Sequence, residues 1–263
     1  MAFTVPSYDL KDKVAIITGS TRGIGNAIAH TMAAYGAAVV ITGRKQEACD
    51  KVAEEIKAAG GKALGVATDV TSAEARQNLV NKTVETFGHI DILVNNAGTG
   101  GQPRKMVDMD EDYFDKYVDA DYKGLYFMSQ LAARQMKEQG CEKGTHPYRI
   151  INLASAAGIK SPIGDTVYGS LKAAVTHLTR IMANELARFG ITVNAIAPGY
   201  VLTDMTKDVM ADEKNVAAVT RMISLRRYAM PEEIAGVVNF VASPAGGYLT
   251  GVLIPVDGGM TIN

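Results

Sequence analysis

Short apolar runs alternate with amphipathic stretches from one end of the chain to the other. Seven runs are continuously apolar, which is typical of parallel strands that are covered on both faces of a sheet. They span residues 13–19, 37–43, 62–70, 91–98, 148–155, 191–199 and 251–259. Helical periodicity lies between them, at residues 24–35, 45–59, 72–87, 110–139, 168–189 and 231–242. The alternation predicts one α/β domain over residues 1–263, with a doubly wound, seven-stranded parallel sheet and helices on both faces.

Composition and charge narrow the classes of function. The net charge of −1 gives no long-range attraction to nucleic acid or to an anionic membrane. No apolar run approaches the roughly 20 residues of a membrane span. Two cysteines make no disulfide framework, and the four histidines have no metal-ligand spacing. We therefore expect no metal and a cytoplasmic location.

A glycine-rich turn follows the first predicted strand. Residues 18–25 read TGSTRGIG. Glycines let the backbone N–H groups of such a turn approach a phosphate, and the helix that follows adds the positive end of its dipole. Ligands of open α/β sheets also bind beyond the carboxyl ends of the strands. The candidate phosphate-binding residues are Gly19, Ser20, Thr21, Arg22, Gly23, Ile24 and Gly25.

Three further segments give this turn a context. They are NNAG at 95–98, YGSLK at 168–172, and the PG of 198–199 with Thr203. In this order and spacing, the four segments resemble the motifs of the short-chain dehydrogenase/reductase family, and the resemblance runs from about residue 10 to the end of the chain. It implies a Rossmann fold, a nicotinamide cofactor and a homotetramer.

The resemblance also assigns cofactor contacts beyond the glycine turn. Asp69 and Val70 would contact the adenine, and the segment Asn96, Ala97 and Gly98 would lie along the adenosine ribose. Tyr168 and Lys172 would hold the nicotinamide ribose. The nicotinamide carboxamide would lie against Pro198, Gly199, Val201 and Thr203.

The end of the second predicted strand bears on the choice of cofactor. A carboxylate there would accept hydrogen bonds from the ribose 2′-hydroxyl and repel a 2′-phosphate. This chain has Gly43, followed by Arg44 and Lys45, with Arg22 in the nearby turn. Cationic residues at a helix start oppose its dipole, and the guanidinium fork matches phosphate geometry. Arg44 therefore predicts NADP(H) rather than NAD(H).

Ser155, Tyr168 and Lys172 are the candidate catalytic residues. Tyr168 and Lys172 are four residues apart, so they share one helix face. A nearby ammonium favours a phenolate, which brings a tyrosine toward general acid/base work. Ser155 follows the fifth predicted strand and can donate a hydrogen bond to a substrate oxygen. These roles predict hydride transfer between the nicotinamide and a ketone or secondary alcohol.

One position departs from the family pattern. Many family members have an asparagine in an NxxG stretch on the helix before the fifth strand, where it supports a water of the proton relay. This chain reads DYKG, with Asp121 in that place. Asp121 is therefore a candidate relay residue that carries a charge.

Alternative functions remain open at this stage. A 3-oxoacyl-[acyl-carrier-protein] reductase would tend to have a basic residue directly before GITVN, where this chain has Phe189 and, one position earlier, Arg188. Sugar-acid and hydroxysteroid dehydrogenases are compatible with the motifs, because specificity lies in loops such as the predicted substrate lid at about 200–230. A non-catalytic nucleotide-sensing or scaffold protein is disfavoured by the intact Ser155, Tyr168 and Lys172.

Overall fold

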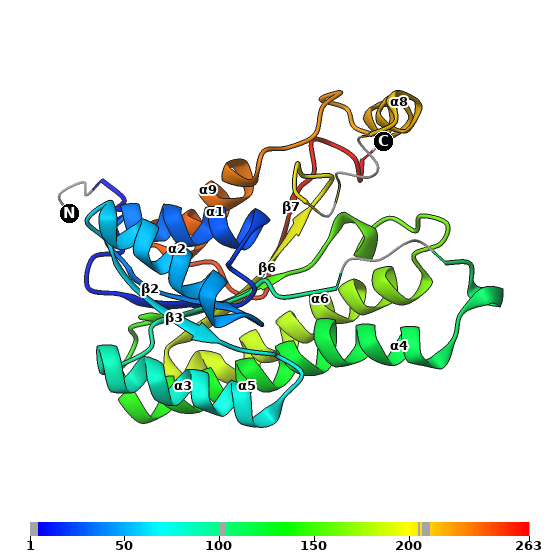
Figure 1. Ribbon diagram of the computed structural model, residues 1–263. Coiled ribbons are helices and arrows are strands. Elements are labelled where there is room, and N and C mark those ends of the chain that lie inside the picture. The colour runs from blue at the N-terminus through cyan, green and yellow to red at the C-terminus, as the bar shows by residue number, and fades with distance from the viewer. Residues whose placement is uncertain (1–4, 100–103, 205, 207–210, 263) are drawn as a thin grey trace.

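The computed structural model describes residues 5–99, 104–204, 206 and 211–262 (Figure 1). Seven strands form one parallel sheet in the order β3-β2-β1-β4-β5-β6-β7, which confirms the predicted doubly wound Rossmann-like fold. The strands are β1 (Val14–Ile17), β2 (Ala38–Gly43), β3 (Lys62–Ala67), β4 (Ile92–Asn95), β5 (Tyr148–Leu153), β6 (Ile191–Pro198) and β7 (Leu253–Val256). The strand order reverses between β1 and β4, which places the expected ligand crevice at their carboxyl ends.

Helices cover both faces of the sheet (Figure 1). One face packs against α1 (Gly23–Ala34), α2 (Gln46–Ala58) and α9 (Pro231–Ala242). The other packs against α3 (Ala73–Phe87), α5 (Leu125–Gln139) and α6 (Thr166–Leu186). Neighbouring strand residues serve opposite faces: Ile16 belongs to the second core and Ile17 to the first. Both cores consist mainly of closely packed aliphatic side chains, so the sheet is a rigid support for the loops at its carboxyl edge.

The segment predicted as one helix over 110–139 is divided in the structure. It contains α4 (Glu111–Tyr117), a π-helical stretch (Val118–Gly124) and α5. The wider winding allows close packing of the chain at Gly124, where a Cβ atom would lie 2.9 Å from the Val70 carbonyl oxygen. Hydrophobic periodicity does not distinguish one wide turn from a regular helix, and such turns are frequent at functional sites.

Several predicted boundaries were also wrong. β3 ends at Ala67 rather than at residue 70, because Asp69 closes a turn by accepting hydrogen bonds from Thr71. β7 is shorter than 251–259, since Gly251 and Gly258 adopt left-handed φ angles of 73° and 63° that end an extended strand.

The predicted lid region contains one short helix, α8 (Glu213–Arg221). A β-bridge between Val201 and Ala229 joins its two ends at the exit of β6. Residues 205 and 207–210 of this region lie outside the described residues. Within the described ranges, none of the helices is both long and apolar enough to cross a bilayer.

Candidate active site

The glycine turn lies at the carboxyl end of β1, where the strand order reverses. Gly19 has φ of +64°, and a Cβ atom there would lie 2.9 Å from the Ala97 Cα. α1 begins at Gly23 after the N-cap residue Arg22, which makes no side-chain cap hydrogen bond. The first backbone N–H groups of α1 are therefore left without a capping side chain, as a phosphate-binding helix start requires. The turn fits the pyrophosphate of a dinucleotide.

Not every side chain predicted at the turn faces a ligand. The buried Ser20 hydroxyl donates to the Ile17 carbonyl and accepts from the Thr42 N–H, at 2.8 and 2.9 Å. The Asn96 amide donates to the carbonyls of Thr18 and Gly19, both at 2.9 Å. Both side chains hold the turn in shape. A phosphate at this point would therefore meet the backbone N–H groups of the turn rather than these two side chains.

Positive charge lies at the end of β2. Arg22 and Arg44 are both exposed, and neither forms an ion pair within the described part of the chain. Thr21 covers Gly43, where a Cβ atom would lie 2.8 Å from the threonine methyl group. The pKa of Asp69 is lowered, first by its hydrogen bond from the Thr71 N–H and, to a smaller extent, by the charge of Arg44. Two unpaired guanidiniums therefore flank the place where a ribose 2′-substituent is expected.

The segment after β6 closes the other end of the crevice. Pro198 is buried in β6, and Gly199 lies so close to Asp257 that a Cβ atom would be 2.8 Å from the aspartate Cα. Thr203 reaches the glycine turn, since a Cβ at Gly23 would lie 3.3 Å from its methyl group. The predicted contacts of the nicotinamide half and of the pyrophosphate thus lie next to each other in the fold.

Ser155 is held against α6 by a short 3-10 turn, Ala156–Gly158. A Cβ atom at Gly158 would lie 2.7 Å from the Lys172 carbonyl carbon, so the turn rests directly on the helix. The Ser155 hydroxyl accepts a hydrogen bond from the Ala157 N–H at 3.1 Å. Its own proton remains available for donation, which is the role that a substrate oxygen would need.

Lys172 lies in a buried network with Asp121. Its Nζ is 3.1 Å from Asp121 Oδ1 and donates to the Leu153 carbonyl at 3.1 Å. The same Nζ lies 5.4 Å from the centre of the Tyr168 ring. Burial alone would lower the pKa of Lys172, but the charges of Asp121 and Tyr168 outweigh it and raise the pKa above its ordinary value. The lysine is therefore held as an ammonium beside Tyr168.

Two residues of this network were missed by the sequence analysis. The Thr99 N–H donates to Asp121 Oδ2 at 2.8 Å, and the Thr99 hydroxyl donates to the same oxygen. Tyr117 packs edge-on to Tyr168 with ring centres 6.3 Å apart, and its hydroxyl accepts a hydrogen bond from the Tyr113 hydroxyl at 3.0 Å. Burial is the main cause that raises the pKa of Tyr117. Thr99 directly follows the NNAG segment, and this position next to a predicted cofactor-binding motif could have suggested that Thr99 lies in the site.

Comparison with known proteins decides the family. A family model described as enoyl-(acyl carrier protein) reductase matches residues 19–261, which is nearly the whole chain and covers the four motifs except Thr18 at the start of the first. The chain belongs to the short-chain dehydrogenase/reductase family. It is an oxidoreductase of carbonyl and alcohol substrates.

Its relatives differ in substrate. A 3-oxoacyl-[acyl-carrier-protein] reductase of Synechocystis sp. is 38% identical, over 96% of this chain and 98% of the relative. An L-rhamnose 1-dehydrogenase (NAD(P)(+)) of Azotobacter vinelandii is 37% identical, over 97% and 98%. A solved 7α-hydroxysteroid dehydrogenase in complex with NADH and 7-oxo glycochenodeoxycholic acid is 36% identical with a TM-score of 0.89, over 98% of both chains. Membership of the family therefore does not determine the cofactor or the substrate of this oxidoreductase, and both must be inferred from its own residues.

Proposed function

We propose that this short-chain dehydrogenase/reductase uses NADP(H) to interconvert a ketone and a secondary alcohol, with Tyr168 as general acid/base. The observation that carries the proposal is the buried Lys172 ammonium, held by Asp121 beside Tyr168 on the helix against which the Ser155 turn rests. The test is NADPH oxidation with a panel of diketones. Binding of NADPH without turnover of any carbonyl compound would instead favour the non-catalytic scaffold alternative.

A bound nicotinamide would supply the hydride chemistry, and the chain's own groups would manage charge and protons. In reduction, the Ser155 hydroxyl would donate to the carbonyl oxygen as negative charge develops there. The Tyr168 hydroxyl would give its proton to that oxygen, and the Lys172 ammonium would stabilise the phenolate that remains. Oxidation of the alcohol would run through the same contacts in reverse.

Asp121→Asn is expected to keep the enzyme active and to move the alkaline pH optimum of alcohol oxidation downward. The substitution removes a negative charge, so formation of the Tyr168 phenolate becomes easier. It also removes the anion that raises the pKa of buried Lys172, so the ammonium loses its proton at lower pH. Both changes act in the same direction. Rates against pH, at saturating cofactor, provide the measurement.

Thr99→Val separates charge from hydrogen bonding in this experiment. It removes a hydroxyl donor to Asp121 but keeps the carboxylate and its pairing with Lys172. We expect its pH optimum to stay closer to that of the native enzyme than the optimum of Asp121→Asn. Superimposable curves for the native protein and Asp121→Asn would show that Asp121 takes no part in the relay.

NADP(H) preference is supported by the unpaired Arg22 and Arg44 beside Gly43 and by the absence of a carboxylate at the end of β2. Both guanidiniums keep their charge at any working pH, so they stay complementary to a 2′-phosphate. A location in the cytoplasm stays a prediction.

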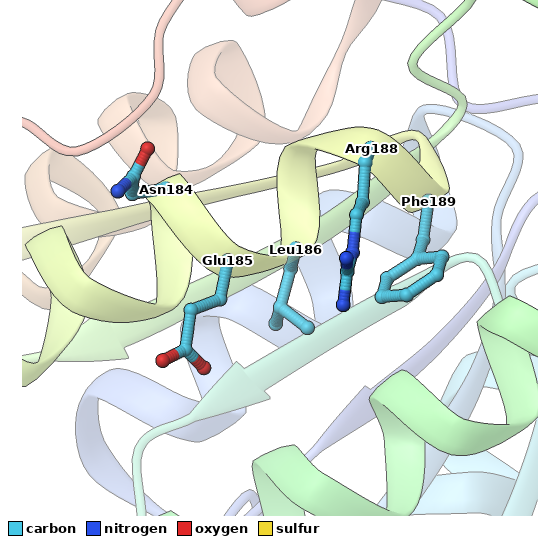
Figure 2. Close-up of a pocket in the computed structure, with 5 residues that line it drawn as sticks. All are labelled: Asn184, Glu185, Leu186, Arg188 and Phe189. Carbon is cyan, nitrogen blue, oxygen red and sulfur yellow. The ribbon is translucent and has the colours of Figure 1, made fainter.

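A homotetramer is also proposed. Exposed apolar side chains lie on the outer sides of α5 and α6, among them Phe127 at 38% and Ile181 at 45% exposure. At the carboxyl end of α6 lies a hollow of about 500 Å³, where Figure 2 shows Glu185, Leu186 and Arg188 on one side of the helix. β7 is the last strand of the sheet, so one of its edges pairs with no other strand, and the nearby Tyr248 is fully exposed. These are two separate surfaces, as two-fold contacts in a tetramer need.

Light scattering should therefore give about four times the chain mass of 27.9 kDa at micromolar concentration. Ile181→Asp should reduce that mass, because it puts a charge into the proposed contact. Ala58→Asp is the matched control, since it also replaces an uncharged apolar residue by aspartate, at an exposed position of α2 on the other side of the sheet. A native protein that scatters as a monomer contradicts the proposal.

The 3-oxoacyl-[acyl-carrier-protein] reductase alternative is favoured by one specific observation. Arg188 and Lys137 both lie over the Phe189 ring, at 4.7 and 5.1 Å from its centre. Two cations therefore surround Phe189, although the residue at that position is not itself basic. Positive charge at this point would attract an acidic carrier protein. Turnover of a 3-oxoacyl thioester that weakens when Arg188 is replaced by alanine would support this alternative.

A further inference from the structure

Three polar side chains near the proposed catalytic residues make no side-chain hydrogen bond or ion pair with the residues that the structure describes. Asp165 is the N-cap residue of α6, and its carboxylate makes neither a cap hydrogen bond nor an ion pair with any residue that the structure describes. The Tyr228 side chain is 6% exposed, yet its hydroxyl has no hydrogen-bond partner in the same ranges. The Tyr200 ring lies edge-on to that of Tyr228, with centres 5.8 Å apart.

Their positions place them at the substrate side of the site. Asp165 directly precedes the helix that carries Tyr168, and a Cβ atom at Gly169 would lie 3.9 Å from the Asp165 Cβ and 2.9 Å from the Ala157 carbonyl oxygen, so Asp165 borders the Ser155 turn. Tyr200 and Tyr228 belong to a small apolar cluster that includes Ala156, the neighbour of Ser155. The Ala229 N–H donates to the Tyr200 carbonyl at 2.9 Å, so both tyrosines are fixed by one short backbone pairing.

The three groups also influence each other electrostatically. Burial raises the pKa of Asp165. Burial and then the charge of Asp165 raise the pKa of Tyr200, while burial and then Tyr200 raise that of Tyr228. Asp165 borders the Ala156–Gly158 turn on one side and the two tyrosines pack against Ala156 of the same turn, so the carboxylate and the two hydroxyls belong to one neighbourhood.

A cation is available next to Asp165 but is used elsewhere. The backbone of Arg104 pairs with the Asp165 segment through a β-bridge. Its guanidinium turns away, forms an ion pair with Asp110 and lies 4.3 Å from the centre of the Tyr113 ring. The Asp165 carboxylate is left as an acceptor that nothing in the described chain satisfies.

The Tyr228 hydroxyl is buried, and buried polar groups are nearly always hydrogen-bonded in folded proteins, so its lack of a partner in the described chain asks for an explanation. The Asp165 carboxylate and the Tyr200 hydroxyl are only partly buried, so a ligand can reach them. An ionised carboxylate only accepts hydrogen bonds, whereas a tyrosine hydroxyl both donates and accepts. The complementary ligand carries several groups that donate and accept at once, which describes neighbouring alcohol hydroxyls. A hydrocarbon chain in the same place would leave all three side chains unpaired.

We propose that Asp165, Tyr200 and Tyr228 form a hydroxyl-binding subsite that selects a polyhydroxylated substrate, a sugar or a polyol. The inference rests on the proposed oxidoreductase function and names the substrate class of that same site. A site that hydrogen-bonds a substrate hydroxyl discriminates strongly against the analogue that lacks it. The Asp165 charge also disfavours an anionic group at this position.

The experiment compares kcat/KM, in the oxidative direction with NADP+, for a panel of aldohexoses, deoxyhexoses and hexitols with kcat/KM for cyclohexanol. The native enzyme should have a higher kcat/KM for at least one sugar or polyol of the panel than for cyclohexanol. Asp165→Asn should lower the ratio of the two values about 10- to 100-fold, as expected for a lost hydrogen bond to a charged group. Asp115→Asn, at an exposed site on α4, is the matched control and should leave the ratio as it is.

Tyr228→Phe guards against a merely structural effect. It removes one hydroxyl that has no partner in the described chain, so the melting temperature should not fall, while the substrate ratio should fall. Equal ratios in native and variant enzymes, or a native preference for cyclohexanol over every sugar and polyol, overturn the subsite but leave the oxidoreductase standing. No turnover of any alcohol or diketone by the native protein overturns both.

Discussion

Tyr168→Phe is expected to lower kcat by about 10²- to 10⁴-fold, the usual contribution of a positioned general acid/base. The substitution removes the only proton that the proposed mechanism delivers to the substrate oxygen. It keeps the ring, which packs edge-on to Tyr117, and leaves the Lys172 pairing with Asp121 in place. Steady-state rates in both directions, for the best substrate of the panel, give the measurement.

The same variant should bind NADPH with nearly native affinity, because the phosphate turn and the unpaired arginines lie at the other end of the crevice. Fluorescence titration with NADPH tests this, and an unchanged melting temperature shows that the fold is intact. Substantial turnover by a cofactor-bound Tyr168→Phe enzyme would mean that another group transfers the proton.

Arg44→Asp is expected to reverse the cofactor preference. The lost guanidinium contact should weaken NADPH binding about 10- to 100-fold, which corresponds to the roughly 1.5–3 kcal/mol of a charged hydrogen bond. The new carboxylate would repel a 2′-phosphate and accept a hydrogen bond from a ribose 2′-hydroxyl, so NADH binding should strengthen. Dissociation constants of both cofactors, for both proteins, provide the test.

Lys51→Asp is the matched control for Arg44→Asp. It makes the same change of charge at an exposed position of α2, away from the end of β2. If it shifts the preference as much as Arg44→Asp does, the effect comes from net charge alone. Equal NADPH and NADH affinities in the native protein would remove the charge argument altogether.

The sheet was predictable because its pattern is local. Continuous apolar runs and the glycine turn identify the strands and the ligand-binding edge, and both cores repeat the period of two along each strand. The Asp121 network was harder to foresee. The sequence marks Asp121 as unusual, but its approach to Lys172 depends on the π-helical stretch, and hydrophobic periodicity does not reveal that stretch.

The proposed hydroxyl-binding subsite illustrates a second limit. In the sequence, Asp165 looks like an ordinary N-cap residue before α6, where a carboxylate normally accepts a hydrogen bond from the first turn. Only the structure shows that this carboxylate makes no cap hydrogen bond and borders the Ala156–Gly158 turn, and that Tyr200 and Tyr228, distant in sequence, pack against the same turn. A missing hydrogen bond leaves no trace in the residue pattern, so sequence alone gives no means of finding it.

The close seating of the Ala156–Gly158 turn on α6 separates chemistry from selectivity. Gly158 and Gly169 let the two segments touch, since a Cβ atom at Gly169 would lie 2.9 Å from the Ala157 carbonyl oxygen. Ser155, Tyr168 and Lys172 therefore share one rigid body. The segment after β6 is closed on itself by the bridge between Val201 and Ala229, and its Tyr200 and Tyr228 pack against Ala156 at the edge of that body. Such a division of labour lets evolution exchange one substrate for another while the proton-transfer apparatus is inherited intact.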